Sequence, residues 1–356
     1  MSEELIYLEA TELESLVSHK LQAAGMSQEH AEEVGRHLRY ADARGIHSHG
    51  AVRVEYYAER IAKGGLTLKP AFKFEQTGPS TGIFHGDNGS GHVAAKEGLF
   101  HAIKLAQDTG VGIVGISKMG HSGMLSYYAD IAAQSDLICL TVCQSDPMAV
   151  PFGGTEPYFG TNPIAFSAPT QGERPIIFDM ATTVQAWGKI LDARSKHLEI
   201  PNNWAVDVQG QPTTDPYKVQ GLLPIAGPKG YGLMMMVDIL SGSLLGLPFG
   251  KHVSSMYSDL SKGRNLGHLH IVINPAYFTD LRQFKENLST MIAELHENQP
   301  TKGFDQVLYP GELAEKIQAE SDIKGIPIVR EIYDYLISET IHFDKYDHSD
   351  TFAEKE

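Results

Sequence analysis

A histidine, an arginine and a tyrosine recur at four-residue intervals near the start of the chain. On a helix, the spacing of His49, Arg53 and Tyr57 places all three side chains on one face, about one turn apart. A guanidinium can clamp a carboxylate, and a neutral imidazole can accept the proton of a hydroxyl. Gly45 and Gly50 nearby would allow close backbone approach. The trio therefore suits a small anionic 2-hydroxy acid, although a solvated helix face would have the same spacing.

A second candidate histidine lies in a glycine-rich loop. The apolar run 111–116 predicts a strand, and His121 follows it just before a helical pattern. Ligand sites of α/β proteins gather at the carboxyl ends of strands, so His121 is a candidate catalytic group. A histidine that merely braces the loop is the alternative. Ser122 does not complete a G-x-S-x-G nucleophile motif, because Met124 stands in place of its last glycine.

Three further segments could meet the phosphates and hydroxyls of a nucleotide. Asp179, Met180 and Ala181 follow an apolar strand pattern and are expected to open a helix, whose N–H groups attract anions. A plain helix cap is the alternative. Lys229 stands at the predicted start of an apolar helix, a poor place for a cation unless an anion binds there. Ser145, in a turn after a strand, could line the same crevice.

A standard Rossmann fold is not expected. The string G-x-G-x-x-G occurs at 110–115, but in the dinucleotide fingerprint the glycines form the turn that opens a helix. Here a helical pattern precedes them, and they lie inside a predicted strand.

Histidine and cysteine patterns do not indicate a metal site. The pair His47 and His49 could join His121 around zinc, but no H-E-x-x-H motif or cysteine cluster accompanies them, so no metal is predicted. Cys139 and Cys143 lie in one apolar run, where buried free thiols are expected.

The chain divides into a helical start and an α/β remainder. Helical patterns cover about 11–24, 27–45 and 49–63. Strands are expected at 111–116, 137–142, 164–168, 176–178 and 268–273, with helices at 96–107, 123–134, from about 183, 229–245 and 281–295. Several strands are apolar throughout, which predicts a sheet buried on both faces.

Composition limits the function classes. The length of 356 residues exceeds the roughly 250–300 at which one core stops growing, so two domains are expected. The net charge of −15 repels phosphate backbones and anionic lipid, which argues against nucleic acid and membranes as partners. The acidic start lacks the features of a secretory signal, and a cytoplasmic protein is expected.

Eight segments resemble the malate/L-lactate dehydrogenase superfamily that lacks a Rossmann domain. They are 41–60, 114–123, 143–154, 160–163, 178–189, 226–236, 244–250 and 254–267, and the likeness covers nearly the whole chain. The HSHG and GHSG loops, DMAT and GPKG are typical of the superfamily. CQSDPM and the run around PFGG indicate a subgroup that acts on ureidoglycolate.

The resemblance implies NAD-dependent oxidation of (S)-ureidoglycolate to oxalurate in allantoin breakdown. It makes His121 the proton acceptor and turns His49, Arg53 and Tyr57 toward the substrate. The residues that it assigns to the cofactor are Ser145, Asp179, Met180, Ala181, Lys229 and Gly311. Related members give the acid/base role to the equivalent of His49, so either histidine could act.

The resemblance also implies an α/β fold in which a non-Rossmann, mixed-sheet NAD-binding domain packs on a helical domain built from both chain ends. Residues 1–75 would begin the helical domain, and residues 76–220 and 265–300 would bind NAD. Residues 221–264 and 301–356 would complete the helical domain and the interface of a homodimer or dimer-based higher homo-oligomer.

Other functions stay open at this point. The runner-up is a dehydrogenase or reductase of another 2-hydroxy acid, such as malate, lactate or a sugar acid. From another class, a histidine-metal hydrolase could act on ureidoglycolate itself. The sequence does not separate NAD from NADP.

Overall fold

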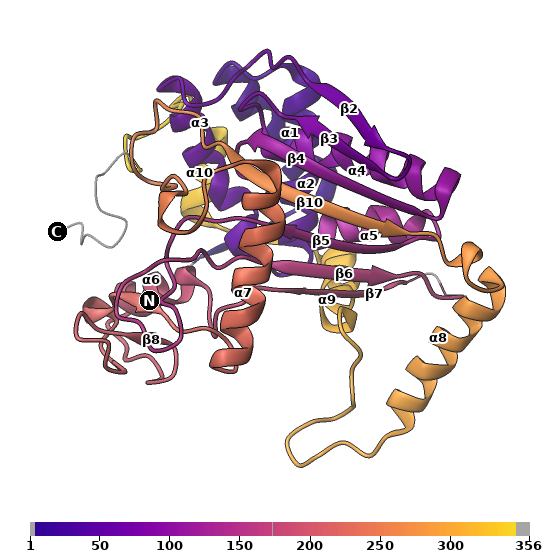
Figure 1. Ribbon diagram of the computed structural model, residues 1–356. Helices are drawn as coiled ribbons and strands as arrows, with labels where there is room; N and C mark the ends of the chain where they lie inside the picture. Colours follow the sequence, from indigo (N-terminus) through magenta and orange to yellow (C-terminus); the bar gives the residue numbers. More distant parts are fainter. Residues whose placement is uncertain (1–3, 173, 347–356) are drawn as a thin grey trace.

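A mixed seven-stranded sheet forms the centre of the molecule (Figure 1). The computed structural model describes residues 4–172 and 174–346, and within them the strand order is β2-β3-β4-β10-β5-β6-β7. Among these described strands, β3 and β4 run parallel and the other neighbours are antiparallel. The strands are β2 (Lys73–Gly78), β3 (Thr81–His85), β4 (Val111–Met119), β5 (Ile138–Cys143), β6 (Ile164–Ala168), β7 (Ile176–Met180) and β10 (Leu266–Ile273). This arrangement confirms the predicted α/β class with a mixed, non-Rossmann sheet.

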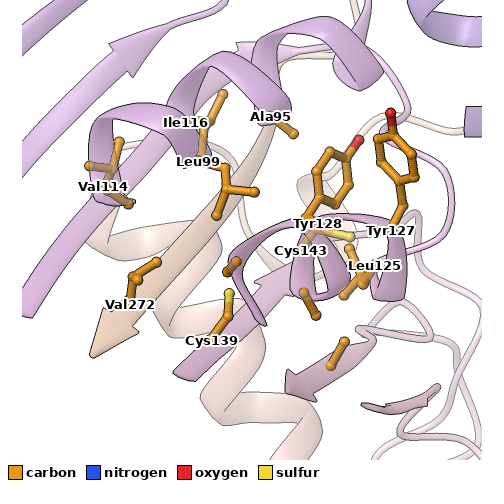
Figure 2. Close-up of a cluster of buried hydrophobic side chains, with 14 of the residues drawn as sticks. Ala95, Leu99, Val114, Ile116, Leu125, Tyr127, Tyr128, Cys139, Cys143 and Val272 are labelled. Atoms are coloured by element: carbon orange, nitrogen blue, oxygen red, sulfur yellow. The ribbon is translucent and has the colours of Figure 1, made fainter. Parts of the chain in front are cut away.

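Helices α4 (Gly91–Thr109) and α5 (Ser126–Gln134) cover one face of this sheet. Leu99 of α4 and Tyr128 of α5 pack with Ile116 of β4 in the largest buried cluster (Figure 2). Cys139 and Cys143 of β5 belong to the same cluster and are free, as predicted. Burial raises the pKa of each thiol to about 12, so both side chains act as apolar packing groups.

Helix α7 (Pro228–Ser241) crosses the opposite face. Its Val237 packs on Val142 of β5 and Leu269 of β10, while Leu233 and Ile239 point to solvent. Beside α7 lie helix α6 (Trp187–Ser195) and the short strands β8 (Ala205–Val206) and β9 (Gly221–Leu222). In Figure 1, α7 stands in front of the sheet.

Both ends of the described chain meet in the helical part. Strand β1 (Leu5–Leu8) pairs antiparallel with β11 (Ile326–Val329). Around this pair pack α1 (Ala10–Ala23), α2 (Gln28–Ala43), α3 (Val54–Ala62), α9 (Glu312–Lys324) and α10 (Arg330–Ile337). Buried leucines such as Leu13, Leu21 and Leu336 form their common core. The exact domain boundaries stay a prediction.

Helix α8 (Leu281–Glu297) projects from the body together with the segment that follows it (Figure 1). It carries the predicted amphipathic stripe, yet none of its residues is buried. Within the described ranges, no helix is long and apolar enough to cross a bilayer.

The predicted continuous helix from His49 to Lys63 is wrong in its first turn. Two 3-10 turns, His47–His49 and Ala51–Arg53, come first, and α3 begins only at Val54. His49 and Arg53 therefore do not share a helix with Tyr57, and their approach to one another depends on how these turns are held.

The prediction that Asp179 to Ala181 open a helix is also wrong. Asp179 and Met180 are the last residues of β7, because both continue the antiparallel ladder with β6. The following helix, α6, begins at Trp187. Asp179 instead accepts the backbone N–H of Ser126 at 2.8 Å, at the start of α5.

Candidate active site

The turn that carries His49 and Arg53 is held by a buried carboxylate. Asp42, near the end of α2, accepts the N–H of Ala51 at 2.7 Å and lies 2.8 Å from Nδ1 of His47. At Gly50 a Cβ atom would lie only 2.1 Å from the carboxyl carbon of Asp42. The close backbone approach predicted at Gly50 is confirmed, and it makes the 3-10 turns possible.

The two candidate histidines face each other. The rings of His49 and His121 stack with their centroids 5.9 Å apart and their planes 22° from parallel. The Tyr57 hydroxyl, from α3, lies 2.8 Å from Nδ1 of His121. Residues 64 or more positions apart in the sequence thus meet at one point, where both imidazoles are half-buried and Tyr57 is buried.

Arg53 lies at the same point. Its Nε donates to the Ser48 carbonyl at 2.7 Å, and its Nη1 donates to the Tyr257 hydroxyl at 3.2 Å. These two bonds fix the half-buried guanidinium at the edge of the site. Its positive charge contributes to the lowered pKa of both His49 and His121.

Both histidines are held neutral. Burial, reinforced by the charge of Arg53, lowers the pKa of His49 to about 3. The same two causes, in the same order, lower the pKa of His121 well below its usual value. A neutral imidazole beside a fixed guanidinium can receive a proton from a bound anionic hydroxy acid.

A third histidine at the site was not predicted from the sequence. His92, in the first turn of α4, is buried, and its Nε2 lies 3.4 Å from the Tyr57 hydroxyl. Burial lowers its pKa to about 3. A cavity of about 20 Å³, enough for one water molecule, opens between Tyr57, His92 and His121. The signal was present, since His92 follows a glycine at a helix start.

Tyr257 was missed as well, because it lies on a loop without periodic pattern. A buried ion pair anchors this loop: Nη2 of Arg264 lies 3.3 Å from Oδ1 of Asp146, just after β5. The other oxygen of Asp146 accepts the N–H of Met256 at 3.0 Å. The loop therefore holds Tyr257 beside Arg53.

A chain of hydrogen bonds runs from Ser145 to the segment that precedes α7. The Ser145 hydroxyl accepts the N–H of Thr161 at 2.8 Å. Thr182 donates its N–H to the Thr161 carbonyl, and its own carbonyl accepts the N–H of Ile225, both at 2.9 Å. Ile225 lies just before α7, so Lys229 stands at the same end of the sheet.

The other predicted cofactor residues lie along β7. Asp179 is half-buried, and burial raises the pKa of its carboxyl group. Met180 and Ala181, also half-buried, follow it. Gly311 adopts a left-handed conformation (φ 95°), and a Cβ there would lie 2.6 Å from the Ile177 carbonyl oxygen. Ser126, which Asp179 caps, begins the helix after the His121 loop, so this strand adjoins the histidine site.

Lys229 has the properties of an anion-binding cation. It is exposed in the first turn of α7, and its ammonium has no hydrogen-bond or ion-pair partner among the described residues. The helix N-terminus and the ammonium are both positive, which favours a phosphate. With the Ser145 hydroxyl and the Asp179 carboxylate, this donor and acceptor set fits a dinucleotide. In residues 4–172 and 174–346, no three His, Cys, Asp or Glu side chains are arranged to hold a metal ion.

Comparison with known proteins identifies the family. Residues 8–337 match the family model described as malate/L-lactate dehydrogenase. The chain is 58% identical to the ureidoglycolate dehydrogenase (NAD(+)) of Escherichia coli K12, over 96% of this chain and 98% of that protein. It is 38% identical to a malate dehydrogenase of Pyrococcus abyssi, over 94% of each chain.

Solved structures agree with this result. The malate dehydrogenase of Pyrococcus horikoshii superposes with a TM-score of 0.85 at 34% identity, over 94% of this chain and 95% of that one. The sulfolactate dehydrogenase of Methanocaldococcus jannaschii gives a TM-score of 0.86 at 34% identity, over 93% and 95%. The resemblance found in the sequence is confirmed, and the chain belongs to the malate/L-lactate dehydrogenase family.

Proposed function

We propose that this protein is an NAD-dependent dehydrogenase that oxidises (S)-ureidoglycolate to oxalurate, a step of allantoin breakdown. The observation that carries the proposal is the 58% identity, over nearly the full length of both chains, to a protein named ureidoglycolate dehydrogenase (NAD(+)). The position of Arg53 beside two neutral histidines supports the proposal, because the guanidinium can bind the substrate's carboxylate while a histidine accepts the proton of the adjacent hydroxyl.

The substrate is held and deprotonated by residues of the histidine site. Arg53 pairs with the substrate carboxylate, which orients the neighbouring carbinol carbon. Neutral His121 takes the hydroxyl proton on Nε2, while Tyr57 holds Nδ1. NAD, when bound, supplies the acceptor for the hydride that leaves the same carbon. The carbinol thereby becomes a carbonyl, and the proton stays on His121 until it is released to solvent.

We assign the base role to His121 and a substrate-facing role to His49. Nδ1 of His121 is engaged by a buried phenol, which leaves Nε2 free for the hydroxyl. Nδ1 of His49 lies 3.0 Å from the hydroxyl of Ser48, in an exposed turn that gives it no comparable support. A well-oriented base is the better catalyst.

The cofactor would be held by the sheet end beside β7. Lys229 and the start of α7 would receive a phosphate. The Asp179 carboxylate and the Ser145 hydroxyl would bond polar groups of the dinucleotide, and Met180, Ala181 and Gly311 would contact it through backbone. These assignments make the sheet end beside β7 and the histidine site two adjoining parts of one active site.

A substrate panel tests the proposal. Purified protein is incubated with (S)-ureidoglycolate, malate, sulfolactate and lactate, each with NAD and with NADP, and NADH or NADPH absorbance is followed. The highest kcat/KM is expected for (S)-ureidoglycolate with NAD. A preference for malate or sulfolactate would favour the second candidate function, a dehydrogenase of another 2-hydroxy acid. The names of the relatives at 38% and 35% identity, a malate and an L-sulfolactate dehydrogenase, support that alternative. Consumption of ureidoglycolate without any nicotinamide would contradict both.

We also propose that the protein works as a homodimer or a dimer-based higher homo-oligomer. Support comes from α7, which leaves Leu233, Met235 and Ile239 exposed to solvent. Leu244, just beyond the helix, is exposed as well. Large apolar side chains exposed together on one segment are typical of an interface between subunits.

A further inference from the structure

The Tyr57 hydroxyl lies between two imidazoles. It is 2.8 Å from Nδ1 of His121 and 3.4 Å from Nε2 of His92. Burial raises the pKa of Tyr57, so the group stays a protonated phenol with a single hydrogen. It can therefore donate to one of the two histidines while it accepts from the other.

The direction of this chain decides whether His121 can act as a base. If the phenol donates to Nδ1 of His121, the imidazole carries its own hydrogen on Nε2 and cannot take a proton there. If the phenol donates to His92, it accepts the Nδ1–H of His121, and Nε2 of His121 is free. His92 is neutral, and when it carries its hydrogen on Nδ1, its Nε2 accepts from the phenol and selects the second, active arrangement.

We propose that His92 is a positioning residue that sets the tautomer of His121 through Tyr57. The inference rests on the proposed function only in taking His121 as the base. Its role corresponds to that of a carboxylate behind a catalytic histidine, which fixes the tautomer without entering the reaction. Within the described chain, no carboxylate is hydrogen-bonded to His121, so the phenol and His92 are the groups available for this task.

The backbone fixes the distance between His92 and the His121 loop. At Gly91, next to His92, a Cβ would lie 2.4 Å from the His121 carbonyl oxygen. At Gly123, in the His121 loop, a Cβ would lie 2.8 Å from Nε2 of His92. The two segments thus touch through glycines on both sides, which leaves little freedom for the chain of hydrogen bonds to lengthen.

A second buried histidine supports His92 from behind. The rings of His37 and His92 meet edge to face, with centroids 4.6 Å apart. Nε2 of His37 accepts the N–H of Met124 at 2.8 Å, so His37 is anchored to the His121 loop. His92 is therefore confined between the loop, Tyr57 and His37.

Steady-state kinetics with the best substrate of the panel test the proposal on four variants: His92→Phe, His92→Gln, Tyr57→Phe and the double variant Tyr57→Phe/His92→Phe. His92→Phe removes the acceptor and is expected to lower kcat roughly 10- to 100-fold, with KM nearly unchanged. His92→Gln keeps an acceptor oxygen and is expected to recover most of the loss. In a Tyr57→Phe background, His92→Phe is expected to cost nothing further, because the phenol that transmits its effect is gone.

A spectroscopic readout separates this proposal from the substrate assignment. In ¹⁵N spectra of the protein without substrate, His121 is expected to carry its hydrogen on Nδ1, and to shift toward Nε2 in His92→Phe. The control is His270→Gln, which removes an equally buried imidazole whose one hydrogen bond, among residues 4–172 and 174–346, is to the Ala95 carbonyl. It is expected to leave both kcat and the His121 spectrum unchanged.

Two outcomes would overturn the proposed role of His92, and a third would refute the proposed function alone. An unchanged His121 tautomer in folded His92→Phe would overturn the proposal, whatever substrate the enzyme prefers. A full further loss of kcat in the double variant would do the same, since His92 would then act independently of Tyr57. Inactivity of the wild type on every 2-hydroxy acid, with the tautomer shift still present, would instead refute the proposed function alone.

Discussion

Arg53 has two electrostatic effects at the scale of single residues. It can attract a carboxylate. Its charge is also the second-largest cause, behind burial, of the lowered pKa of both His49 and His121. A base with an ordinary pKa of about 6.5 would lose activity in mild acid. In this site burial, reinforced by the charge of Arg53, keeps the base deprotonated in mild acid.

The pH profile of kcat/KM for oxidation should reflect this shift. A base works when neutral, and because the pKa of His121 is lowered, kcat/KM should stay level through pH of about 6.5 and fall only in more acidic solution. Arg53→Gln should move the acid limb upward, toward the ordinary value. Initial rates across a pH series measure both limbs. A wild-type inflection at or above the ordinary histidine value would contradict the assignment.

Removing the guanidinium tests the carboxylate clamp itself. Arg53→Ala should raise KM, lower kcat or both, with kcat/KM reduced roughly 100-fold, about the value of a charge-assisted bidentate pair. Arg53→Lys should recover only part, because an ammonium lacks the planar fork. The control is Arg330→Ala, which loses an exposed ion pair with Glu4. Wild-type kinetics in Arg53→Ala would rule out the clamp.

At the scale of elements, the sequence predicted the helices and strands that have a clear apolar pattern. The long apolar strands β4, β5 and β10 and the amphipathic helices are where their patterns predict them. Strands β1 and β11 were missed, because each has four residues and pairs with a segment more than 300 positions away. Strand β2 was missed because most of its residues are exposed and lack an apolar alternation.

Candidate site residues could be predicted where the residue type and its local motif indicate a particular chemistry. The sequence singled out His49, Arg53, Tyr57 and His121, but it placed His49 and Arg53 on the helix of Tyr57, which begins only at Val54. Their actual positions depend on tertiary contacts such as the Asp42 carboxylate on the backbone of the 46–53 turn. No local pattern encodes such a contact, and the same applies to Tyr257 and His92.

The turn at Gly50 gives a prediction for this scale. Gly50→Ala would place a methyl group against the Asp42 carboxylate, and we expect a loss of about 1–3 kcal/mol in stability together with a raised KM. Differential scanning calorimetry and steady-state kinetics measure the two effects. Gly188→Ala, inside α6 with open space around its Cβ, should be neutral or slightly stabilising. Unchanged stability and KM in Gly50→Ala would show that the turn can move without consequence.

At the scale of the whole molecule, buried neutral histidines link stability to pH. Four of them, His37, His92, His268 and His270, are almost completely buried, and burial lowers the pKa of each. The unfolded chain takes up protons below pH of about 6.5, while the folded protein does not until much lower pH. Stability is therefore full above that value and falls as the pH decreases.

This linkage predicts an early acid transition. Each of these histidines can remove up to about 1.4 kcal/mol per pH unit below pH of about 6.5, so Tm should fall steeply between neutral and mildly acidic buffers. Thermal unfolding followed by circular dichroism measures the slope. His270→Gln, which keeps a donor for the Ala95 carbonyl, should make the slope shallower. A Tm that is flat across this range would contradict the buried neutral state.

The outer side of α7 gives the last prediction, because a helix so apolar would be costly to leave in water. Ile239, near the end of α7, is 51% exposed, and Leu244, just beyond the helix, is 60% exposed. Ile239→Glu should convert a dimer into a monomer in light scattering after size exclusion, since an unpaired carboxylate would be buried in the interface. Ile323→Glu, at a site 84% exposed on α9, should leave the mass unchanged. A dimer that persists in Ile239→Glu would move the interface elsewhere, whereas a monomeric wild type would require α7 to be covered by something other than a second copy.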